Sequence, residues 1–464
     1  MQAVAAAEPH AARCWFAALP HSLLVNILAR LLPRARARCA TVCRAFRDAL
    51  EDPAAWAVLD TSRGERPFRD DKGFTAEALR AAAARARGAL RVLDLNDLSV
   101  PDDAVLGVLT SNAAALREVF LCGSTQYEHE VAVMSTFVHE VLDAAPALQT
   151  LAANYQVQCT YEEARAMLRR EAPYAPLSMR GLRVSRTGAV DNREVDEDTS
   201  DDIVALAADL AIHGGAHQLV ALELFSMLVE PAALDALADT VCALPSVTEI
   251  KFAECVVLTE CIPAMARLVR APGLTRLFIW DVAGDEPGFL GDSLVVVPQL
   301  AAALQTSSLT HLELCRVYLW RNFASASSLI CALIGHPHLK ALDLSDNSAA
   351  DAEVPQAVIG ALLGGLISAR RGALEELRAS DSDLNDDALA VLFRALPHAP
   401  RLRSLWLVGN DMSDECITEC LMPALRENTG LRDLQLFSSY EPEPSAAMDE
   451  AEQVVFDRTP AEDR

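Results

Sequence analysis

The stretch Leu339-Lys340-Ala341-Leu342-Asp343-Leu344-Ser345-Asp346-Asn347 decides the fold that we expect for this chain. Its leucines follow the pattern L-x-x-L-x-L, so Leu342 and Leu344 point to the same side of a short strand. Asn347 is suited to closing the turn that follows, because its side chain can satisfy backbone groups there. One such strand cannot bury its own apolar row, so we expect neighbouring strands built in the same way.

The same spacing occurs twelve times, mostly at intervals of about 26 to 35 residues. That interval lies at or slightly above the range of leucine-rich repeats, whose units pair a strand with a helix. Asn385-Asp386-Asp387 supports the helical half, because an amide cap and first-turn acids favour a helix start. We therefore predict an α/β leucine-rich-repeat solenoid, a horseshoe with parallel strands inside and helices outside. The matches begin at Leu90, Leu116, Leu148, Met179, Leu219, Val247, Leu274, Leu309, Leu339, Leu374, Leu402 and Leu431.

Composition permits a large core and disfavours several classes of function. The 464 residues are 52% hydrophobic, yet no run of about 18 apolar residues indicates a transmembrane helix. The net charge of −25 repels phosphate backbones, which argues against nucleic-acid binding. The twelve cysteines include no C-x-x-C pair, so we predict no zinc site and no disulfide framework. Reduced thiols are expected, in the cytoplasm or the nucleus.

A helical pattern precedes the repeats. After Leu19-Pro20 the apolar positions follow helical spacing, and Pro20 suits a first helical turn, while Pro33 ends the helix. A second predicted helix carries Cys39, Val42, Cys43 and Phe46 on one face. Two or three such helices share little core, and the first has more apolar surface than the bundle can cover, which indicates a partner. The Arg- and Ala-rich N-terminus also fits an organelle transit peptide.

These helices resemble the F-box. The family pattern is met by Leu19-Pro20, Leu23/Leu24, Ile27/Leu28, Leu31, Val42-Cys43-Arg44-Ala45-Phe46 and Trp56. The chain departs from the pattern at Ser22, where an acidic or amide residue is usual. It departs again between the helices, where the stretch is rich in Arg and Ala and not in Asp and Leu. The resemblance implies that a Skp-type adaptor, and through it a cullin, is bound by Leu19, Pro20, Leu23, Leu24, Ile27, Leu28 and Leu31.

The predicted organisation has five parts. Residues 1–13 form a disordered N-terminus, 14–60 an all-α F-box, 61–88 a linker or cap, 89–437 the repeats, and 438–464 an acidic disordered tail. Three repeats are stretched, and we expect the extra residues to form loops at the edge of the solenoid. The extra residues are 155–174, 191–202 and 281–297.

No catalytic site is predicted. Gly291-Asp292-Ser293-Leu294 matches a short serine-esterase signature, but no His has an Asp three places before it to complete that chemistry. His129-Glu130 and His139-Glu140 do not make H-E-x-x-H. The Asp pairs at 102/103, 201/202 and 386/387 fit helix starts, and no phosphate-binding Gly-rich loop is present. We therefore predict no enzyme, metal or cofactor.

The outward-facing strand positions form the expected binding surface. Intervening residues of L-x-x-L-x-L face away from the core, and exposed aromatics among charges of both signs suit a protein partner. The predicted substrate-binding residues are Phe120, Phe225, Phe278, Trp280, Glu313, Arg378, Trp406 and Phe437.

An adaptor-docking module followed by a recognition solenoid is similar to the leucine-rich-repeat F-box proteins. The resemblance implies the substrate-recognition subunit of a Skp–cullin–F-box ubiquitin ligase, which supplies proximity and no chemistry of its own. Two alternatives stay open. One is a binding protein similar to ribonuclease-inhibitor-like solenoids, with the N-terminal helices as a cap, and the other is a regulator of a small GTPase.

Overall fold

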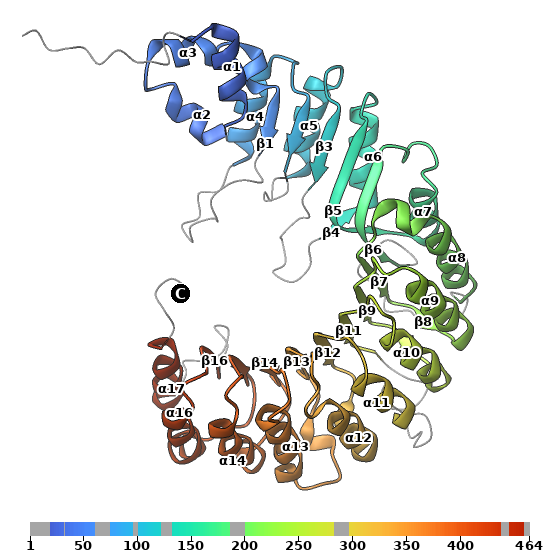
Figure 1. Cartoon of the computed structure of the whole chain (residues 1–464), viewed down its shortest axis with the longest axis vertical. Helices are drawn as coiled ribbons and strands as arrows, with labels where there is room; N and C mark the ends of the chain where they lie inside the picture. The colour runs from blue at the N-terminus through green and yellow to red at the C-terminus, as the bar shows by residue number, and fades with distance from the viewer. Residues whose placement is uncertain are drawn as a thin grey trace, which may run out of the picture. The chain divides into compact units, whose positions relative to one another are not determined.

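The chain folds into two compact units in the computed structural model. The first comprises Met1–Gln158 and Arg170–Arg180, and the second comprises Cys159–Arg169 and Gly181–Arg464. Within each unit, short parallel strands form one layer and helices cover one side of it (Figure 1). The structure describes residues 19–31, 33–60, 75–95, 101–121, 132–185, 200–282, 297–437 and 445–458.

A small helical bundle opens the first unit. It contains α1 (His21–Ala29), α2 (Pro33–Cys39), α3 (Arg44–Leu50) and the 3-10 helix η2 (Pro53–Trp56). Helix α1 packs against α3 and η2, and the buried Trp56 donates its Nε1–H to Leu50 O at 2.8 Å. The prediction of one continuous second helix is wrong, because Cys43 is extended and separates α2 from α3. Val42 lies in that break and is 64% exposed.

The sheet of the first unit begins earlier than predicted. β1 pairs with β2, so the expected all-α F-box over 14–60 ends in a strand, and α4 lies within the predicted linker or cap over 61–88. The central residues Leu59, Leu93, Val119 and Leu151 align across four strands and are fully buried. The strands are β1 (Val58–Asp60), β2 (Val92–Asp94), β3 (Glu118–Leu121) and β5 (Thr150–Cys159) in that order, with β4 (Ala132–Met134) beside β5. The helices are α4 (Ala76–Ala86), α5 (Asp102–Asn112) and α6 (Ser135–Ala144).

The second unit contains a longer parallel sheet with the predicted strand–helix alternation. Leu342 of the repeat pattern aligns with Leu312 on one side and Leu377 on the other, all at most 1% exposed. In sheet order the strands are β6 (Leu177–Val184), of which only the part from Gly181 onward belongs to this unit, β7 (Ala221–Phe225), β9 (Glu249–Ala253), β11 (Arg276–Trp280), β12 (His311–Cys315), β13 (Ala341–Asp343), β14 (Glu376–Arg378), β15 (Ser404–Trp406) and β16 (Asp433–Gln435). A separate pair is β8 (Leu228–Val229) with β10 (Val256–Val257).

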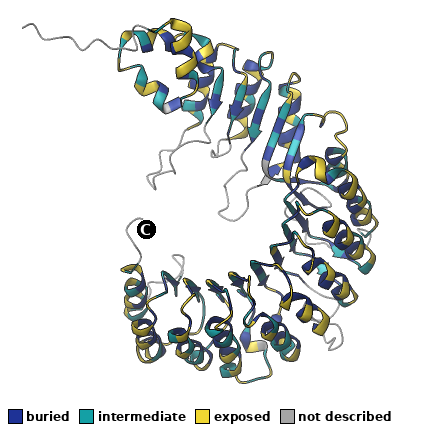
Figure 2. Ribbon diagram, in the orientation of Figure 1, coloured by how far each residue is buried: buried dark blue, intermediate teal, exposed yellow. Residues whose placement is uncertain are grey.

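Helices of the second unit follow the strands one by one. Figure 2 shows their buried residues toward the strands and their exposed residues on the opposite side. Asn385 caps α14 by accepting from Ala388 N, which confirms the predicted helix start. Among the described helices, none combines the length and the apolarity that a bilayer span requires. The helices are α7 (Tyr161–Leu168), α8 (Ser200–His217), α9 (Pro231–Ala243), η3 (Thr259–Cys261), α10 (Ile262–Val269), α11 (Val297–Gln305), η4 (Leu319–Arg321), α12 (Phe323–Leu333), η5 (Ala349–Asp351), α13 (Gln356–Ser368), α14 (Asp386–Ala395), η6 (Leu396–His398), α15 (Asp414–Cys416), the π-helical η7 (Ile417–Leu421), α16 (Met422–Glu427) and α17 (Ala446–Phe456).

In the second unit, each strand of the main sheet from β7 to β15 is followed within three residues by a residue in the left-handed region. Asp281 N–H donates to Cys315 O at 2.9 Å, and Arg316 N–H donates to Ser345 O at 3.2 Å. The next repeat holds each of these residues in place, although positive φ is unfavourable for residues other than glycine. The residues are Ser226, Glu254, Asp281, Arg316, Asp346, Asp381 and Gly409.

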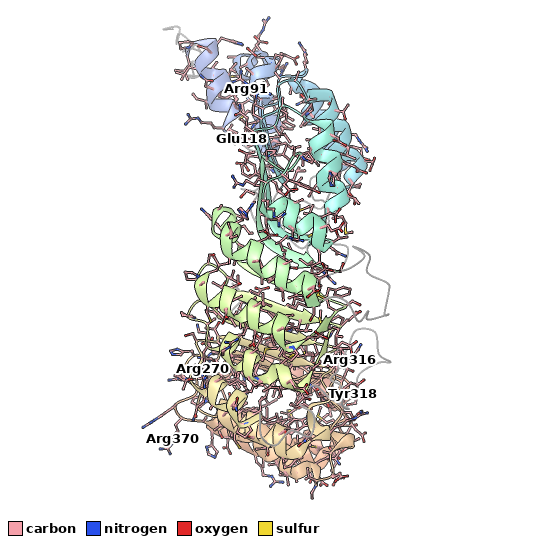
Figure 3. The ribbon with its side chains drawn as sticks, turned by 90° about the vertical axis from the view of Figure 1, so that its right-hand side faces the viewer. Arg91, Glu118, Arg270, Arg316, Tyr318 and Arg370 are labelled. Atoms are coloured by element: carbon pink, nitrogen blue, oxygen red, sulfur yellow. The ribbon has the colours of Figure 1, made fainter. Side chains whose placement is uncertain are left out.

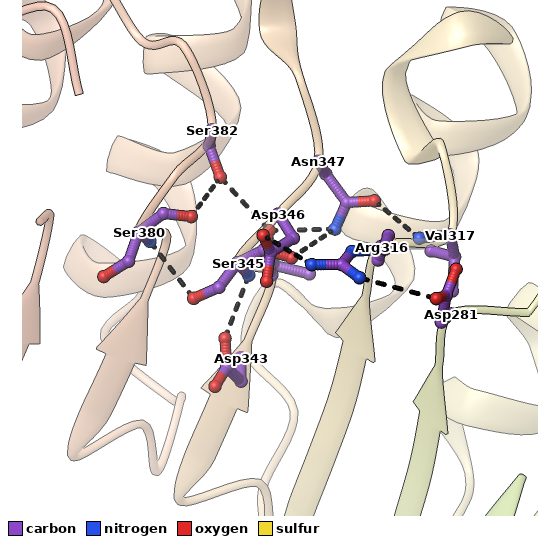
Figure 4. A network of polar contacts seen from close by, with 10 residues as sticks. Asp281, Arg316, Val317, Asp343, Ser345, Asp346, Asn347, Ser380 and Ser382 are labelled. Carbon is purple, nitrogen blue, oxygen red and sulfur yellow. Dashed lines mark hydrogen bonds and ion pairs between the residues drawn. The ribbon is translucent and has the colours of Figure 1, made fainter. Parts of the chain in front are cut away.

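Asn347 closes the turn after β13, as predicted. Its side chain is fully buried, and Oδ1 accepts from Val317 N and Leu319 N, both at 3.1 Å (Figure 4). Its Nδ2 group donates to Leu314 O at 2.6 Å and Leu344 O at 2.8 Å. The amide thus joins two successive repeats. It forms hydrogen bonds with buried backbone N–H and C=O groups, which the apolar side chains of the core cannot do.

Two segments that were predicted to lack regular structure contain helices. The prediction of a loop over 155–174 is wrong, because Thr160 and Glu163 form a capping box that starts α7. The prediction of a disordered tail over 438–464 is wrong over α17, whose Ala451 and Val455 are buried. Residues 1–13, and most of the stretches 191–202 and 281–297, lie outside the described residues.

Candidate protein-interaction surfaces

Helix α1 presents only part of its predicted apolar surface to solvent. Leu23 and Ile27 are 44% and 36% exposed, and Pro20 before them is also exposed. Leu24 and Leu28 are at most 3% exposed, because α1 turns them toward α3 and η2. These two predicted adaptor-binding leucines therefore pack inside the bundle, and their contact with an adaptor stays a prediction. Leu19 and Leu31 are half-buried.

Arg36 lies inside the bundle and donates hydrogen bonds to four backbone carbonyl groups, which the sequence did not predict. Its side chain is fully buried, and burial lowers the pKa of its guanidinium to about 10 even though the charge of Asp60 opposes this. The guanidinium also lies 5.4 Å from the ring centroid of Trp56. Its hydrogen bonds reach Leu31 O at 2.7 Å, Ala29 O at 2.8 Å, Ala55 O at 2.9 Å and Val58 O at 2.6 Å.

In the second unit, the strand register brings the middle outward residues of successive repeats into one row, which we call the central row. Neighbours in the row are direct cross-strand partners, so their side chains are close enough to interact. The central row consists of Arg183, Glu223, Lys251, Phe278, Glu313, Asp343, Arg378, Trp406 and Gln435. Of the predicted substrate-binding residues, Phe278, Glu313, Arg378 and Trp406 belong to it.

The N-terminal end of the central row is a buried charge cluster. Glu223 Oε1 lies 3.4 Å from Arg183 Nε and 3.4 Å from Lys251 Nζ, and the side chains of Arg183 and Glu223 are each 2% exposed. The Arg183 guanidinium lies 4.3 Å from the ring centroid of Phe225, which is 2% exposed. The prediction that Phe225 is an exposed anchor is wrong, and Phe278 is also buried, at 8% exposure.

Trp280 is the half-buried last residue of β11 and lies between two cations. Lys251 Nζ lies 5.8 Å from its ring centroid and the Arg316 guanidinium lies 6.0 Å from it. Arg316 also bridges Asp281 at 3.5 Å and Asp346 at 3.6 Å (Figure 4). These contacts raise the pKa of Arg316, although burial alone would lower it. Trp280 is therefore held in one orientation while part of its ring stays accessible.

The Arg316 bridge lies at one edge of the repeats. Figure 3 shows Arg316 and Tyr318 at that edge, with Arg270 and Arg370 at the opposite edge. The sequence prediction omitted Arg316, Asp281 and Asp346. All three come two places after the last apolar position of their repeats, and this shared spacing was a signal that could have found them.

Trp406 forms a second ordered aromatic position. Its Nε1–H donates to Asp433 Oδ2 at 2.6 Å, and the Arg378 guanidinium stacks 3.8 Å from its ring centroid. Glu376 accepts from Arg378 Nε, which holds the guanidinium over the indole. Both Trp406 and Arg378 are half-buried, so the pair presents a rigid surface that combines an aromatic face with a cation.

Glu313 and Asp343 form an acidic pair between these aromatic positions. Burial, and then the charge of Asp343, raise the pKa of Glu313 to about 7. Burial and the same carboxylates raise the pKa of the adjacent Cys315 thiol well above its ordinary value. One potential ligand atom of each of the three residues lies within 4.8 Å of the others, so among the described residues they are the candidates for holding a metal. The expected absence of a metal stays a prediction.

The remaining predicted substrate-binding residues lie elsewhere. Phe120 belongs to β3 of the first unit, where it aligns with Asp94 and Ala152 and is half-buried. Phe437 follows β16 and is also half-buried. The structure thus brings together Trp280, Glu313, Arg378 and Trp406 on one face, whereas Phe120 lies in the other unit.

Comparison with known proteins assigns the N-terminal bundle. The search of curated proteins found no match to this chain. Residues 16–62, which include α1, α2, α3, η2 and β1, match the family described as F-box-like. The N-terminal region of this chain is therefore an F-box-like domain.

Proposed function

We propose that this protein is the substrate-recognition subunit of a Skp–cullin–F-box ubiquitin ligase. The observation that carries the proposal is the F-box-like match over residues 16–62, because F-box domains generally bind Skp-type adaptors. The exposed Pro20, Leu23 and Ile27 support it, since apolar side chains that a small bundle leaves in solvent are typical of an interaction site. The subunit itself would do no chemistry and would work in the cytoplasm or the nucleus.

We further propose that the strand–helix units are leucine-rich repeats forming a horseshoe, and that the outward face of their strands binds a protein substrate. The buried L-x-x-L-x-L positions and the parallel register support this assignment. Trp280 and Trp406 support the substrate face, because ordered and partly exposed aromatics next to arginines are typical of binding hot spots. The substrate would be held close to a ubiquitin-conjugating enzyme through the adaptor and cullin.

A binding experiment with a purified Skp-type adaptor tests the first proposal. The full chain should bind, and Leu23→Asp with Ile27→Asp should weaken binding at least tenfold, because both changes place charge on the exposed side of α1. Ile212→Asp is the matched control, since Ile212 is 73% exposed on α8 of the other unit. If the unmodified chain does not bind the adaptor, the ligase proposal fails and a non-catalytic solenoid binding protein becomes the better description.

A second experiment separates substrate recognition from adaptor binding. Proteins captured by the full chain from cell extract should be lost with Trp406→Ala, while adaptor binding stays unchanged. Val204→Ala, at an exposed residue of α8 outside the central row, is the control. Equal capture by all three proteins would contradict the assignment of the strand face.

A further inference from the structure

A small arginine-lined pocket lies where the helical bundle meets the C-terminal end of α4. It has a volume of about 120 Å³ and is lined by Ala40, Arg47, Leu50, Glu51, Arg85 and Arg87. The residues come from the turn before α3, from α3 itself, and from the end of α4. None of them is among the residues proposed to bind the adaptor, so the pocket is a separate feature of the domain.

Existing contacts position the three guanidinium groups. Arg47 Nε donates to Ala40 O at 3.3 Å, which ties its side chain to the preceding turn. The Arg85 guanidinium lies 4.9 Å from the ring centroid of Trp56, a fully packed residue of the bundle. Arg87 Nη2 lies 3.7 Å from Glu51 Oε2, and Arg87 leaves α4 in the left-handed conformation. The pocket is therefore built from ordered elements of both the bundle and α4.

The charges of the lining residues define the ligand class. Three guanidinium cations and one carboxylate leave two uncompensated positive charges around a space of about 120 Å³. Guanidinium groups bind phosphate oxygens through paired N–H donors, and a phosphate monoester near pH 7 carries close to two negative charges. A single carboxylate would neutralise only half of this excess.

The surroundings of the pocket also favour an anion. Residues 30–52 contain six arginines and three acidic residues, in a chain whose net charge is −25. At physiological salt, charges more than about 8 Å away are largely screened, so the lining residues act on an anion in the pocket more strongly than distant acidic residues do. We propose that the pocket binds a phosphate monoester group, supplied either by a small phosphorylated molecule or by a phosphorylated side chain.

Titration of the full chain with inorganic phosphate, followed by ³¹P NMR, tests the site. Arg47→Gln with Arg87→Gln should weaken binding at least tenfold, whereas Arg85 is left intact because it packs on Trp56. Arg44→Gln with Arg80→Gln removes the same charge from exposed residues outside the pocket and should change binding less than twofold. Glu51→Gln should tighten binding several-fold, because it removes the carboxylate that competes for Arg87.

A phosphoserine peptide and its glutamate analogue distinguish the sources and the chemistry. Tighter binding of the phosphopeptide than of inorganic phosphate assigns the site to a phosphorylated side chain, and the reverse order assigns it to a small phosphorylated molecule. Equal binding of the glutamate peptide would overturn the phosphate assignment. No binding by the unmodified chain, or equal loss in both double variants, would overturn the site itself.

Discussion

Glu313 and Asp343 lie directly opposite each other on the parallel strands β12 and β13. Two carboxylates in that relationship repel each other, and the positive charges of Arg378, Lys251 and Arg276 offset only part of this repulsion and of the cost of burial. Their arrangement is stable when Glu313 holds a proton, which is the state that its raised pKa of about 7 favours below neutral pH.

We expect the stability of the second unit to fall as pH rises through the acidic to neutral range. The pKa of Glu313 is raised from 4.5 to about 7, so the native state keeps a proton that the unfolded chain has already lost. The free energy of unfolding should therefore decrease from about pH 4.5 to about pH 7, by roughly 1–3 kcal/mol from this residue.

Glu313→Gln isolates that contribution. Relative to the unmodified chain, it should be stabilising at pH 8 and nearly neutral at pH 4.5, because glutamine has no proton to lose. Urea unfolding of both proteins across this pH range measures the difference. Parallel pH curves for the two proteins would contradict the assignment.

Arg36→Met should destabilise the F-box-like domain strongly. The substitution leaves four carbonyl groups without the guanidinium that they share, and unsatisfied buried polar groups cost about 1–3 kcal/mol each before relaxation. We expect loss of adaptor binding together with increased protease sensitivity of residues 19–60. Arg38→Met, on the same helix but exposed, should leave both properties unchanged.

Asn347→Ala should cost more stability than Asn410→Ala. Both amides close the turn after a strand, but Asn347 is fully buried whereas Asn410 is half-buried and can be replaced in part by water. We expect about 3 kcal/mol or more for Asn347 and about 1–2 kcal/mol for Asn410, measured by denaturant unfolding. Equal losses would mean that burial of the amide is irrelevant.

Phe225→Ala should mainly reduce stability, whereas Trp280→Ala should mainly reduce substrate capture. Phe225 is 2% exposed and supports Arg183, so its removal should cost about 3–5 kcal/mol of stability. Trp280 is half-buried, so its removal should cost less stability but should reduce capture of the substrate. Thermal unfolding and the capture assay, measured on the same preparations, distinguish the two effects.

Gly409→Ala should be more harmful than Gly335→Ala, although both glycines have positive φ. A Cβ at Gly409 would overlap Asp381 Oδ1, whereas a Cβ at Gly335 would meet nothing within 4 Å. Gly335→Ala should therefore show only the backbone cost of about 1 kcal/mol. A similar shift in the melting temperature for both variants would show that Asp381 moves away freely.

Much of the local structure could be predicted from the sequence because it depends on short spacings. Period-two leucines place Leu342 and Leu377 in the core whatever their neighbours are, and Asn385 caps α14 through residues only three positions away. The F-box-like pattern was visible for the same reason, since its leucines and tryptophan occur at fixed intervals. The acidic composition of residues 438–464 predicts disorder, but Ala451 and Val455 lie four residues apart on one face of α17 and are buried by tertiary packing.

The candidate sites depended on contacts between residues far apart in the chain. The sequence determined that the strands would repeat and which residues would face outward, since both follow from alternation along a strand. Only the tertiary structure decided that Arg36 is buried among four carbonyls, that Phe225 is covered by Arg183, and that Glu313 meets Asp343. Burial and the electrostatic field at a side chain are set by neighbouring strands and helices, and no spacing within one repeat specifies them.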